Sequence, residues 1–452
     1  MDALLPTDLS GRKVLVMGLG AFGGGAGCAR ALVQLRAEVT VTDLRPADAL
    51  QEAIALLEGL PITYALGGHH REMFEAADVV VVNPAVPNES KWLQVAHECG
   101  CLLTTEVNLA LSLVADLPAI AITGTHGKST CASLCAHLLD ALPGTTLLAG
   151  NLGGSLLEQV LPLTKEDRLV VELSSFQTER LIAPPGWPKV AILTSFGSDH
   201  LDRHHTVEAY AKAKRNLLLA QDETCTVLLP STGAEADQWS ELAHGTVERL
   251  DKNCLTDFGL TTADLPFSEP YRLTSALAAL RAARLLGVDD GNLRAKIHSY
   301  SGLPHRMHAF VDAHGRNIID NGVATHPEPT TAALEHLGEN VVLIAGGKDK
   351  GLNLQQLCRT CAHCPRLYFY GEGGQRLALE CRSIGVEALV FETCRAAMEA
   401  ALKTWIPGET VLFSPTFSSY DEFRNFRDRA RIFLSFCSSV PVGLHEGGHE
   451  TA

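Results

Sequence analysis

The sequence predicts an α/β protein of three domains, and the pattern of its strands is the main reason. Short apolar or β-branched runs alternate with helical patterns through most of the 452 residues, which is typical of parallel sheets joined by crossover helices. The runs are continuously apolar, so we expect sheets that are covered on both faces. The predicted strands begin at Lys13, Glu38, Asp78, Ala119, Arg168, Lys189, Asn340 and Thr410.

Three strand-to-loop junctions of the kind that bind nucleotides divide the chain into domains. They follow KVLVMG, follow AIAITG, and lie around GGKDKG and SPTFSS. Together with the Gly- and Pro-containing linker SGLPH, they predict a Rossmann-like domain over 1–106, a central P-loop-type ATPase domain with a mostly parallel sheet over 107–302, and a Rossmann-like α/β domain over 303–452. Within the central domain, the polar stretch 251–270 predicts an irregular surface connection.

Composition and charge narrow the class of partners. Lys and Arg number 37 against 52 Asp and Glu, which gives a net charge of −15. So acidic a surface repels nucleic acid and anionic membranes, and any anionic ligand needs a local basic or amide-lined pocket. The start of the chain lacks a signal-peptide pattern and no apolar run reaches the roughly 20 residues of a membrane span. We expect a cytoplasmic monomer with no nucleic-acid partner and no membrane insertion.

Thirteen cysteines are spread through the chain. Cys358, Cys361 and Cys364 have the C-x-x-C spacing of a metal site, but two of them also fit an apolar helix stripe with Leu357, and no second cluster nearby completes a zinc site. The helix stripe and the lack of a second cluster therefore favour free or buried thiols over a metal.

The first glycine-rich loop, Gly18 to Gly23, follows a strand and opens a helix, and Asp43 ends the next strand. This is the spacing of a dinucleotide fingerprint, in which glycines allow close approach of phosphate and the acid binds a ribose. It favours a nucleotide ligand over a bare structural turn, and taken alone it indicates an NAD-dependent dehydrogenase.

The second loop, Gly124 to Thr130 (GTHGKST), lies between an apolar strand and a helix. Its backbone N–H groups and the helix N-terminus would surround phosphates, Lys128 would neutralise them, and Ser129 would offer its hydroxyl to Mg²⁺. A dehydrogenase has no use for this loop, so ATP is the predicted ligand and the oxidoreductase hypothesis is disfavoured.

The whole set of motifs resembles the Mur ligases, the ATP-dependent amide-forming ligases of peptidoglycan synthesis. The motifs occur in the same order as in that family and cover nearly the whole chain; they are GTHGKST (124–130), GNLGG (150–154), VVELSSFQ (170–177), SDHLDRH (198–204), YAKAK (210–214), GLPHR (302–306), GGKDKG (346–351) and SPTFSSYDEF (414–423). VELSSFQ, GGKDKGLNL and SPTFSSYDEFRNF favour the member that adds D-glutamate to UDP-N-acetylmuramoyl-L-alanine through an acyl phosphate.

Three departures keep other members of the family open. His126 stands where the D-glutamate-adding member usually has Asn, and His326-Pro327 is similar to the L-alanine-adding branch. The family's Asp-Ser-Lys-Ala-Thr stretch appears as Asn321-Gly322-Val323-Ala324-Thr325, with Asp320 one residue earlier. The alternatives are therefore an L-alanine-adding ligase or a relative that binds nucleotides without catalysis.

The resemblance implies a set of catalytic and metal-binding residues. Ser129 and Glu172 would hold one Mg²⁺, and His200 with a carbamylated Lys214 would hold a second. Lys128 and the linker residue Arg306 would act on the phosphates. Without the family, Lys214 would be interpreted as an exposed helical lysine.

The resemblance also implies the ligand contacts. ATP would be bound by Gly124, Thr125, His126, Gly127, Lys128, Ser129, Thr130, Asn151, Gln177 and Arg306. The two other substrates would be bound by Gly18, Ala21, Phe22, Asp43, Leu44, Arg45, Asn151, Ser174, Thr325, Lys350, Ser419 and Phe426. From the residues alone, Phe22 and Phe426 fit a core equally well, and Ser419 would cap a helix that begins at Tyr420.

Overall fold

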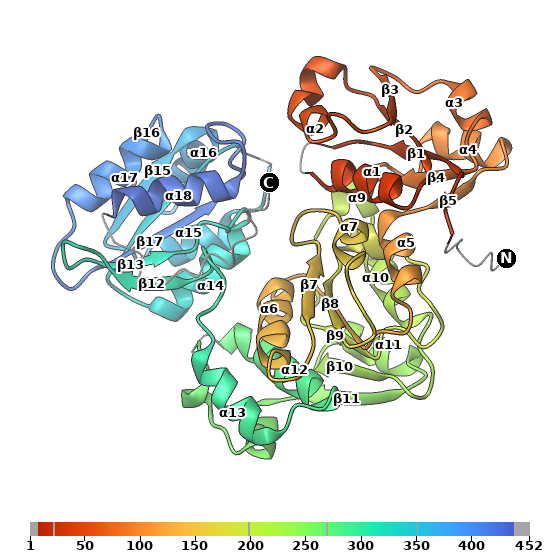
Figure 1. The fold of residues 1–452 in the computed structure, drawn as a ribbon. Helices are drawn as coiled ribbons and strands as arrows, with labels where there is room; N and C mark the ends of the chain where they lie inside the picture. The colour runs from red at the N-terminus through yellow and green to blue at the C-terminus, as the bar shows by residue number, and fades with distance from the viewer. Residues whose placement is uncertain (1–7, 21–22, 198, 268–269, 350, 438–452) are drawn as a thin grey trace. The chain divides into compact units, whose positions relative to one another are not determined.

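The computed structural model describes residues 8–20, 23–197, 199–267, 270–349 and 351–437 (Figure 1). The chain forms two compact units, Met1–Ser301 and Gly302–Ala452. The first unit contains two sheets and the second contains one. Each of the eight predicted apolar runs is a strand, and the α/β class is confirmed.

The first sheet is parallel in every described pairing and has the order β3-β2-β1-β4-β5. Its strands are β1 Lys13–Met17, β2 Glu38–Asp43, β3 Ile62–Leu66, β4 Val79–Val82 and β5 Leu102–Thr104; its helices are α1 Gly24–Gln34, η1 Ala47–Leu50, α2 Gln51–Ala55, α3 Arg71–Glu75 and α4 Lys91–Glu98. Because the chain moves from β1 to β2 on one side and reaches β4 on the other, the carboxyl end of β1 is a topological switch point.

The second sheet is also parallel in every described pairing, with the order β11-β10-β9-β6-β8-β7. Its strands are β6 Ala119–Thr123, β7 Thr146–Gly150, β8 Arg168–Glu172, β9 Val190–Leu193, β10 Thr226–Pro230 and β11 Thr246–Leu250. Ile120 and Ile122 enter the core on one face, and Ala119 and Ala121 enter the core on the other. Burial on both faces explains the continuous apolar run of β6.

Helices cover both faces of this second sheet. They are α5 Glu106–Leu113, α6 Lys128–Leu139, α7 Leu156–Val160, α8 Ser175–Thr178, α9 Leu201–His204, α10 Val207–Arg215, α11 Ala234–Leu242, α12 Pro270–Leu285 and α13 Asp290–Ser299, with 3-10 turns η2 Asn216–Leu218, η3 Lys252–Phe258 and η4 Thr262–Asp264. The side chains of α6 and α12 pack in one cluster on the face that carries Ile120 and Ile122.

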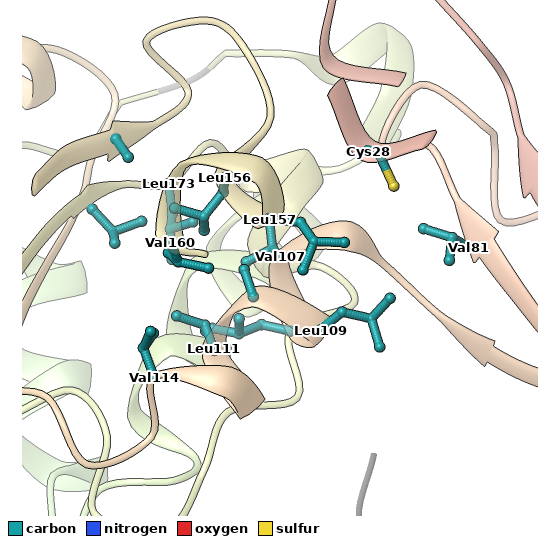
Figure 2. Close-up of a cluster of buried hydrophobic side chains, with 14 of the residues drawn as sticks. Cys28, Val81, Val107, Leu109, Leu111, Val114, Leu156, Leu157, Val160 and Leu173 are labelled. Carbon is teal, nitrogen blue, oxygen red and sulfur yellow. The ribbon is translucent and has the colours of Figure 1, made fainter. Parts of the chain in front are cut away.

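A single apolar cluster joins the first two sheets into one unit. Figure 2 shows Leu156 and Leu157 of α7 beside Val107 of α5, and Cys28 and Val81 of the first sheet's layers also belong to this cluster. Side chains of both sheets share this cluster, so the carboxyl edges of the two sheets are held by one continuous core.

The third sheet has the order β12-β13-β17-β14-β15-β16, and only the β12–β13 pairing is antiparallel among the described pairings. The strands are β12 His308–Val311, β13 Asn317–Asp320, β14 Val341–Gly346, β15 Arg366–Tyr370, β16 Leu389–Phe391 and β17 Thr410–Thr416; the helices are α14 Pro327–Leu337, α15 Gln355–Cys361, α16 Gly371–Arg382, α17 Cys394–Lys403 and α18 Phe426–Phe436. One cluster packs α14 and α15 on one face, and a second packs α17 and α18 on the other.

The structure corrects the expectation for 251–270. This stretch forms η3 and η4, and it buries Leu255, Phe258 and Leu260 in the core of the second sheet. Polar residues such as Asp251 and Asp264 instead accept hydrogen bonds at the starts of these short turns. Apolar residues spaced irregularly between capping residues gave no helical period to detect.

All thirteen cysteines carry free thiols. Cys358 and Cys361 lie on α15 and pack with Leu357 in the core, as the helix stripe predicts. In the part of the chain that the structure describes, no three His, Cys, Asp or Glu side chains are grouped as a metal site. Nor does any helix in that part combine the length and apolar character needed to span a bilayer.

Candidate active site

The loop Gly124–Thr130 lies where the centre of the second sheet ends. It connects β6 to α6, and β6 lies between β8 and β9. Gly127 caps α6 in the left-handed conformation, with φ 82°, which glycine adopts without steric cost. The loop is tied to the end of β9, because the His126 N–H donates to Ser195 Oγ at 2.8 Å and the Thr194 hydroxyl donates to the His126 carbonyl at 2.5 Å. A helix N-terminus beneath a fixed loop suits a phosphate group.

Two lysines converge on this loop. Lys128 Nζ donates to the carbonyl oxygens of Gly124 and Thr125, both at 2.9 Å, and Lys214 Nζ donates to the same Gly124 oxygen at 2.8 Å. Lys128 comes from the loop itself, whereas Lys214 comes from α10, more than eighty residues later. The structure therefore brings together two predicted site residues that are far apart in sequence.

Lys214 is not an exposed helical lysine. Its side chain is 1% exposed, and its ammonium nitrogen lies 4.5 Å from the centroid of the Tyr210 ring, one helical turn earlier on α10. Burial, and next to it the positive charge of Lys128, lower the pKa of Lys214 to about 6. At neutral pH the Lys214 side chain is therefore mainly an uncharged amine.

Glu172 ends β8 next to the loop, as the sequence predicts. Its Oε1 accepts a hydrogen bond from Asn151 Nδ2 at 3.0 Å, while its Oε2 is buried and accepts no hydrogen bond from the described protein groups. A buried carboxylate oxygen without a donor is costly unless a cation occupies the space beside it. Asn151 and Glu172, predicted separately, thus form one group.

Ser174 and Gln177 form the capping box of α8. The Ser174 hydroxyl and backbone N–H both donate to Gln177 Oε1, at 3.0 and 2.9 Å, and the Gln177 N–H donates back to Ser174 Oγ at 3.3 Å. This pairing fixes the turn directly after β8 and stabilises the short helix. In this structure the side-chain oxygen of Gln177 serves the cap.

His200 lies seven residues beyond β9, as the N-cap residue of α9 with φ 52°. Its ring lies 5.0 Å from the Phe176 ring and 6.2 Å from the Tyr210 ring, centroid to centroid. Tyr210 also contacts Lys214 and has its hydroxyl 3.2 Å from Thr125 Oγ1. His200 and Lys214 therefore both contact Tyr210, whose hydroxyl lies next to the phosphate loop.

The glycine loop of the first sheet forms a second predicted group. Asp43 Oδ2 accepts hydrogen bonds from the Leu19 and Gly20 N–H groups at 3.0 and 3.3 Å, and it also pairs with Arg45 Nη2 at 3.1 Å. Burial opposes ionisation of Asp43, but the hydrogen bonds from Arg45 and Gly20 outweigh it and hold the pKa of Asp43 below its usual value. Asp43 therefore stabilises the glycine loop through these two backbone hydrogen bonds.

The other predicted residues of this group differ in their surroundings. Gly18 has φ 98° and its carbonyl accepts from Asn83 Nδ2 at 3.2 Å. Leu44 is exposed, and Arg45 is partly exposed beside Asp43. Ala21 and Phe22 lie outside the described residues.

The second unit carries the remaining predicted residues. Ser419 is buried directly after Ser418, whose carbonyl accepts from the Lys348 N–H at 2.9 Å, so the two predicted loops at this edge of the third sheet lie together. Thr325 Oγ1 lies 3.2 Å from His326 Nδ1 at the start of α14. Arg306 is half-buried in the linker, and Lys350 lies outside the described residues.

One expectation for this unit needs correction. The last helix begins at Phe426 with Asn425 as its cap, so Ser419 is followed by a turn rather than capping a helix. Asp320 is fully buried and accepts from His305 Nδ1 at 2.6 Å and from the Gly322 N–H at 2.9 Å, which leaves it bound within its own unit. Phe426 is half-buried, with the guanidinium of Arg427 at 5.6 Å from its ring.

Several site residues were missed by sequence reasoning. Thr194 and Ser195 hold the phosphate loop, and Arg203 lies beside Phe176 with its guanidinium 5.3 Å from the ring. Thr194 and Ser195 directly follow β9, the neighbour of β6. Their position at the carboxyl edge of the sheet was the sequence feature that could have identified them as site residues. Arg203 lies inside a motif that was used only for His200.

Models of known families match three parts of the chain. They are a Mur ligase MurD-like N-terminal domain over residues 12–104, a Mur ligase middle domain over 122–256, and a Mur ligase glutamate ligase domain over 305–417. Among curated proteins, the chain is 34% identical to UDP-N-acetylmuramoylalanine–D-glutamate ligase of Geobacter metallireducens, covering 96% of this chain and 99% of the relative. It is 32% identical to the protein of the same name from Enterococcus hirae, covering 95% and 97%.

Solved structures share the fold at lower identity. MurF from Acinetobacter baumannii matches with a TM-score of 0.59 at 16% identity, over 94% of this chain and 93% of that one. MurF ligase from Thermotoga maritima, solved in complex with ADP, matches with a TM-score of 0.57 at 14% identity, over 97% and 98%. The relatives match this chain over almost their whole length, and the phosphate loop with its two lysines is consistent with that match. The chain belongs to the Mur ligase family.

Proposed function

We propose that this chain is an ATP-dependent, ADP-forming ligase that adds D-glutamate to UDP-N-acetylmuramoyl-L-alanine in peptidoglycan synthesis. The observation that carries the proposal is the group around the phosphate loop: Lys128 and Lys214 on one carbonyl oxygen, and Glu172 with a buried oxygen that lacks a donor. Relatives named for this reaction match nearly the whole chain at 32 to 34% identity, which supports the choice of substrates.

The site suits activation of a carboxylate. An amide does not form directly from a carboxylate and an amine at neutral pH, since an oxide leaving group is too poor. Transfer of the γ-phosphoryl group of ATP to the carboxylate gives an acyl phosphate and ADP; the amine then attacks the acyl carbon, loses a proton, and phosphate leaves. Both steps concentrate negative charge, and cations such as Lys128 stabilise it.

The residues present fit Mg²⁺, because carboxylate and hydroxyl oxygens are the ligands this ion prefers. Ser129 and Glu172 would hold one ion, and the orphaned Glu172 Oε2 supports this choice. His200 and a carbamylated Lys214 would hold a second. Bound Mg²⁺ would neutralise charge on the phosphates.

Lys214 meets the chemical requirement for carbamylation. An uncharged amine adds to CO₂, and the nitrogen loses one proton, which gives an anionic carbamate oxygen in place of a cation. The burial of Lys214 and its pKa of about 6 keep the amine uncharged at neutral pH. A carbamate there would give the Lys128 ammonium an anionic partner.

We assign one substrate to the part of the chain around each sheet. Residues 1–106 would bind the UDP-sugar, 107–302 would bind ATP, and 303–452 would bind the amino acid. The nucleotide sugar would meet the glycine loop and the ATP-side residues; the proposed contacts are Gly18, Ala21, Phe22, Asp43, Leu44, Arg45, Asn151 and Ser174. D-glutamate would meet Thr325, Lys350, Ser419 and Phe426, and Arg306 would reach the phosphates with Gln177.

The reaction would take place in the cytoplasm, by a monomer. Thirteen free thiols are what a reducing compartment produces. Size-exclusion chromatography with light scattering would check the expected mass of 48.4 kDa.

A matrix of phosphate-release assays tests the proposal. UDP-N-acetylmuramoyl-L-alanine and UDP-N-acetylmuramate are each combined with D-glutamate or L-alanine in the presence of ATP and Mg²⁺. We expect phosphate release only with UDP-N-acetylmuramoyl-L-alanine plus D-glutamate. Release only with UDP-N-acetylmuramate plus L-alanine would establish the alanine-adding alternative, and binding without release would establish a non-catalytic relative.

A further inference from the structure

The loop that follows β4, residues 83–90, lies at the carboxyl edge of the first sheet. We call it the β4 loop. Its residues Ala85, Pro87, Asn88 and Glu89 are exposed. It lies next to the glycine loop, because β1 pairs with β4 and Asn83 Nδ2 donates to the Gly18 carbonyl at 3.2 Å. An exposed loop at a switch point is a place where ligands bind, provided that something holds it in place.

Two arginines of the second sheet's layers hold the β4 loop at a single atom. Arg180 Nη2 and Arg203 Nη2 each donate to the Val86 carbonyl oxygen at 2.9 Å. Arg180 Nη2 also donates to Asn88 Oδ1 at 2.5 Å, and Arg203 Nη1 donates to the Ala85 carbonyl at 3.4 Å. The β4 loop is therefore fixed by side chains from another sheet.

Two carboxylates lie near the two guanidinium groups, and of these two Glu179 is shielded from solvent whereas Glu89 is not. Glu179 Oε2 accepts from Arg203 Nη2 at 2.9 Å, while Glu89, the other carboxylate near Arg180, is exposed and lies beside His205. Arg180 Nη1 is buried and donates to none of the described groups. Burial, and then the charge of Arg203, lower the pKa of Arg180. Two guanidinium groups held this close favour an anion along the β4 loop.

Arg203 also connects the β4 loop to the proposed metal site. It lies on α9, whose N-cap residue is His200, and its guanidinium lies over the Phe176 ring that packs against His200. His204, the next residue, has Nε2 within 2.9 Å of Ser175 Oγ on α8. The same short segment thus contacts the β4 loop on one side and the phosphate-loop region on the other.

We propose that Arg180 and Arg203 are positioning residues that clamp the β4 loop, so that an anionic nucleotide sugar lying along it presents its carboxylate to the phosphate loop. The inference rests on the proposed function for the identity of the nucleotide sugar. The clamp itself is a contact between Val86 and the two guanidinium groups. It explains why the motif that contains His200 also contains an arginine.

Kinetics of Arg203→Met and Arg180→Met test the clamp. Methionine keeps much of the apolar stem but donates no hydrogen bond. Loss of two hydrogen bonds from a charged donor predicts a roughly tenfold or greater fall in kcat/KM for UDP-N-acetylmuramoyl-L-alanine, with the KM for ATP unchanged within about twofold. Arg203→Lys, which keeps the positive charge and N–H donors but lacks the planar guanidinium fork, is expected to recover part of the loss. Arg71→Met is the matched control, since Arg71 pairs with Glu75 and Glu98 on an exposed surface.

Hydrogen exchange gives a readout that does not depend on activity. Amides of the β4 loop should exchange faster in Arg203→Met than in the wild type, and no faster in Arg71→Met. Unchanged exchange in this loop, or unchanged kcat/KM for the nucleotide sugar, would overturn the clamp. A loss of thermal stability in which the KM values for ATP and nucleotide sugar rise together would also overturn it. If the wild type releases no phosphate with any substrate pair, the proposed function fails, and the exchange measurement still decides the clamp.

Discussion

Glu106 is a buried carboxyl group whose ionisation should make its own contribution to folding depend on pH. It begins α5, and its oxygens accept from the Ser155 hydroxyl at 2.5 Å and from the Leu156 N–H at 3.4 Å. Burial raises the pKa of Glu106 to about 7 against the hydrogen bonds from Ser155 and Leu156, and the charge of Glu158 raises it further. Glu158 in turn pairs with Arg30 of α1.

The raised pKa decides whether Glu106 stabilises the fold more at low or at high pH. The folded chain binds the proton of Glu106 more tightly than the unfolded chain does, so the stabilising contribution is complete below the ordinary pKa of 4.5 and is lost as the pH rises through about 7. The difference between the two pKa values corresponds to about 3 kcal/mol. Glu106 should therefore contribute less to the stability of unit Met1–Ser301 at pH 8 than at pH 5, by up to this amount.

Glu106→Gln removes the ionisation and keeps the shape of the side chain. At pH 8 we expect a free energy of unfolding about 2 kcal/mol above that of the wild type, the value left after one hydrogen bond of about 1 kcal/mol is lost. At pH 5 this advantage should almost disappear, because about 1 kcal/mol of the ionisation cost remains in the wild type and the lost hydrogen bond offsets it.

Urea unfolding at both pH values, followed by tryptophan fluorescence, provides the measurement. Trp187 and Trp239 are buried in the same apolar cluster as the helices around Glu106, and Trp405→Phe removes the signal from the second unit. Glu75→Gln serves as the exposed control. If Glu106→Gln were destabilised equally at pH 5 and pH 8, the assignment of a buried, protonated Glu106 would be refuted.

Three further predictions concern the phosphate loop. Lys128→Met should abolish phosphate release and weaken ADP binding by calorimetry at least tenfold, because Lys128 neutralises phosphate charge; unchanged binding would contradict its role. Lys214→Ala should lose turnover, while Lys214→Glu retains part of it. In the wild type, ¹³C NMR with labelled bicarbonate should show a carbamate signal that is missing from both variants and that fades below about pH 6, where the amine is protonated. Equal activity of Lys214→Ala and the wild type would contradict carbamylation. Gly124→Ala should lose ATP binding with its circular dichroism intact, because a Cβ would lie 2.1 Å from Thr194 Oγ1 and φ is 150° there; normal ADP affinity would contradict this close approach.

Much of the fold could be predicted from local patterns. Buried parallel strands such as β1, β6 and β8 are continuous apolar runs, and each leads into a loop that carries the chemistry. Glu172 and Gly127 therefore lie where the sequence places them, at the ends of a strand and of a loop. The stretch 251–270 was mispredicted because its buried residues have no regular period.

Contacts between segments that are distant in sequence could not be predicted from the sequence. The burial of Lys214 depends on the packing of α10 against the loop after β6, and the helical pattern of α10 alone makes Lys214 look like a surface residue. The clamp of Arg180 and Arg203 joins residues about 90 to 120 positions away to Val86. A turn follows Ser419 in place of the predicted helix start, and α18 begins at Phe426 with Asn425 as its cap.

The central claim is that this site activates a carboxylate with ATP before the amide forms. The most direct measurement uses UDP-N-acetylmuramoyl-L-alanine whose alanyl carboxylate carries ¹⁸O, with D-glutamate, ATP and Mg²⁺, and mass spectrometry of the released phosphate. An acyl-phosphate route transfers one labelled oxygen from each carboxylate to phosphate. Phosphate released in step with the new amide but free of ¹⁸O would contradict the account.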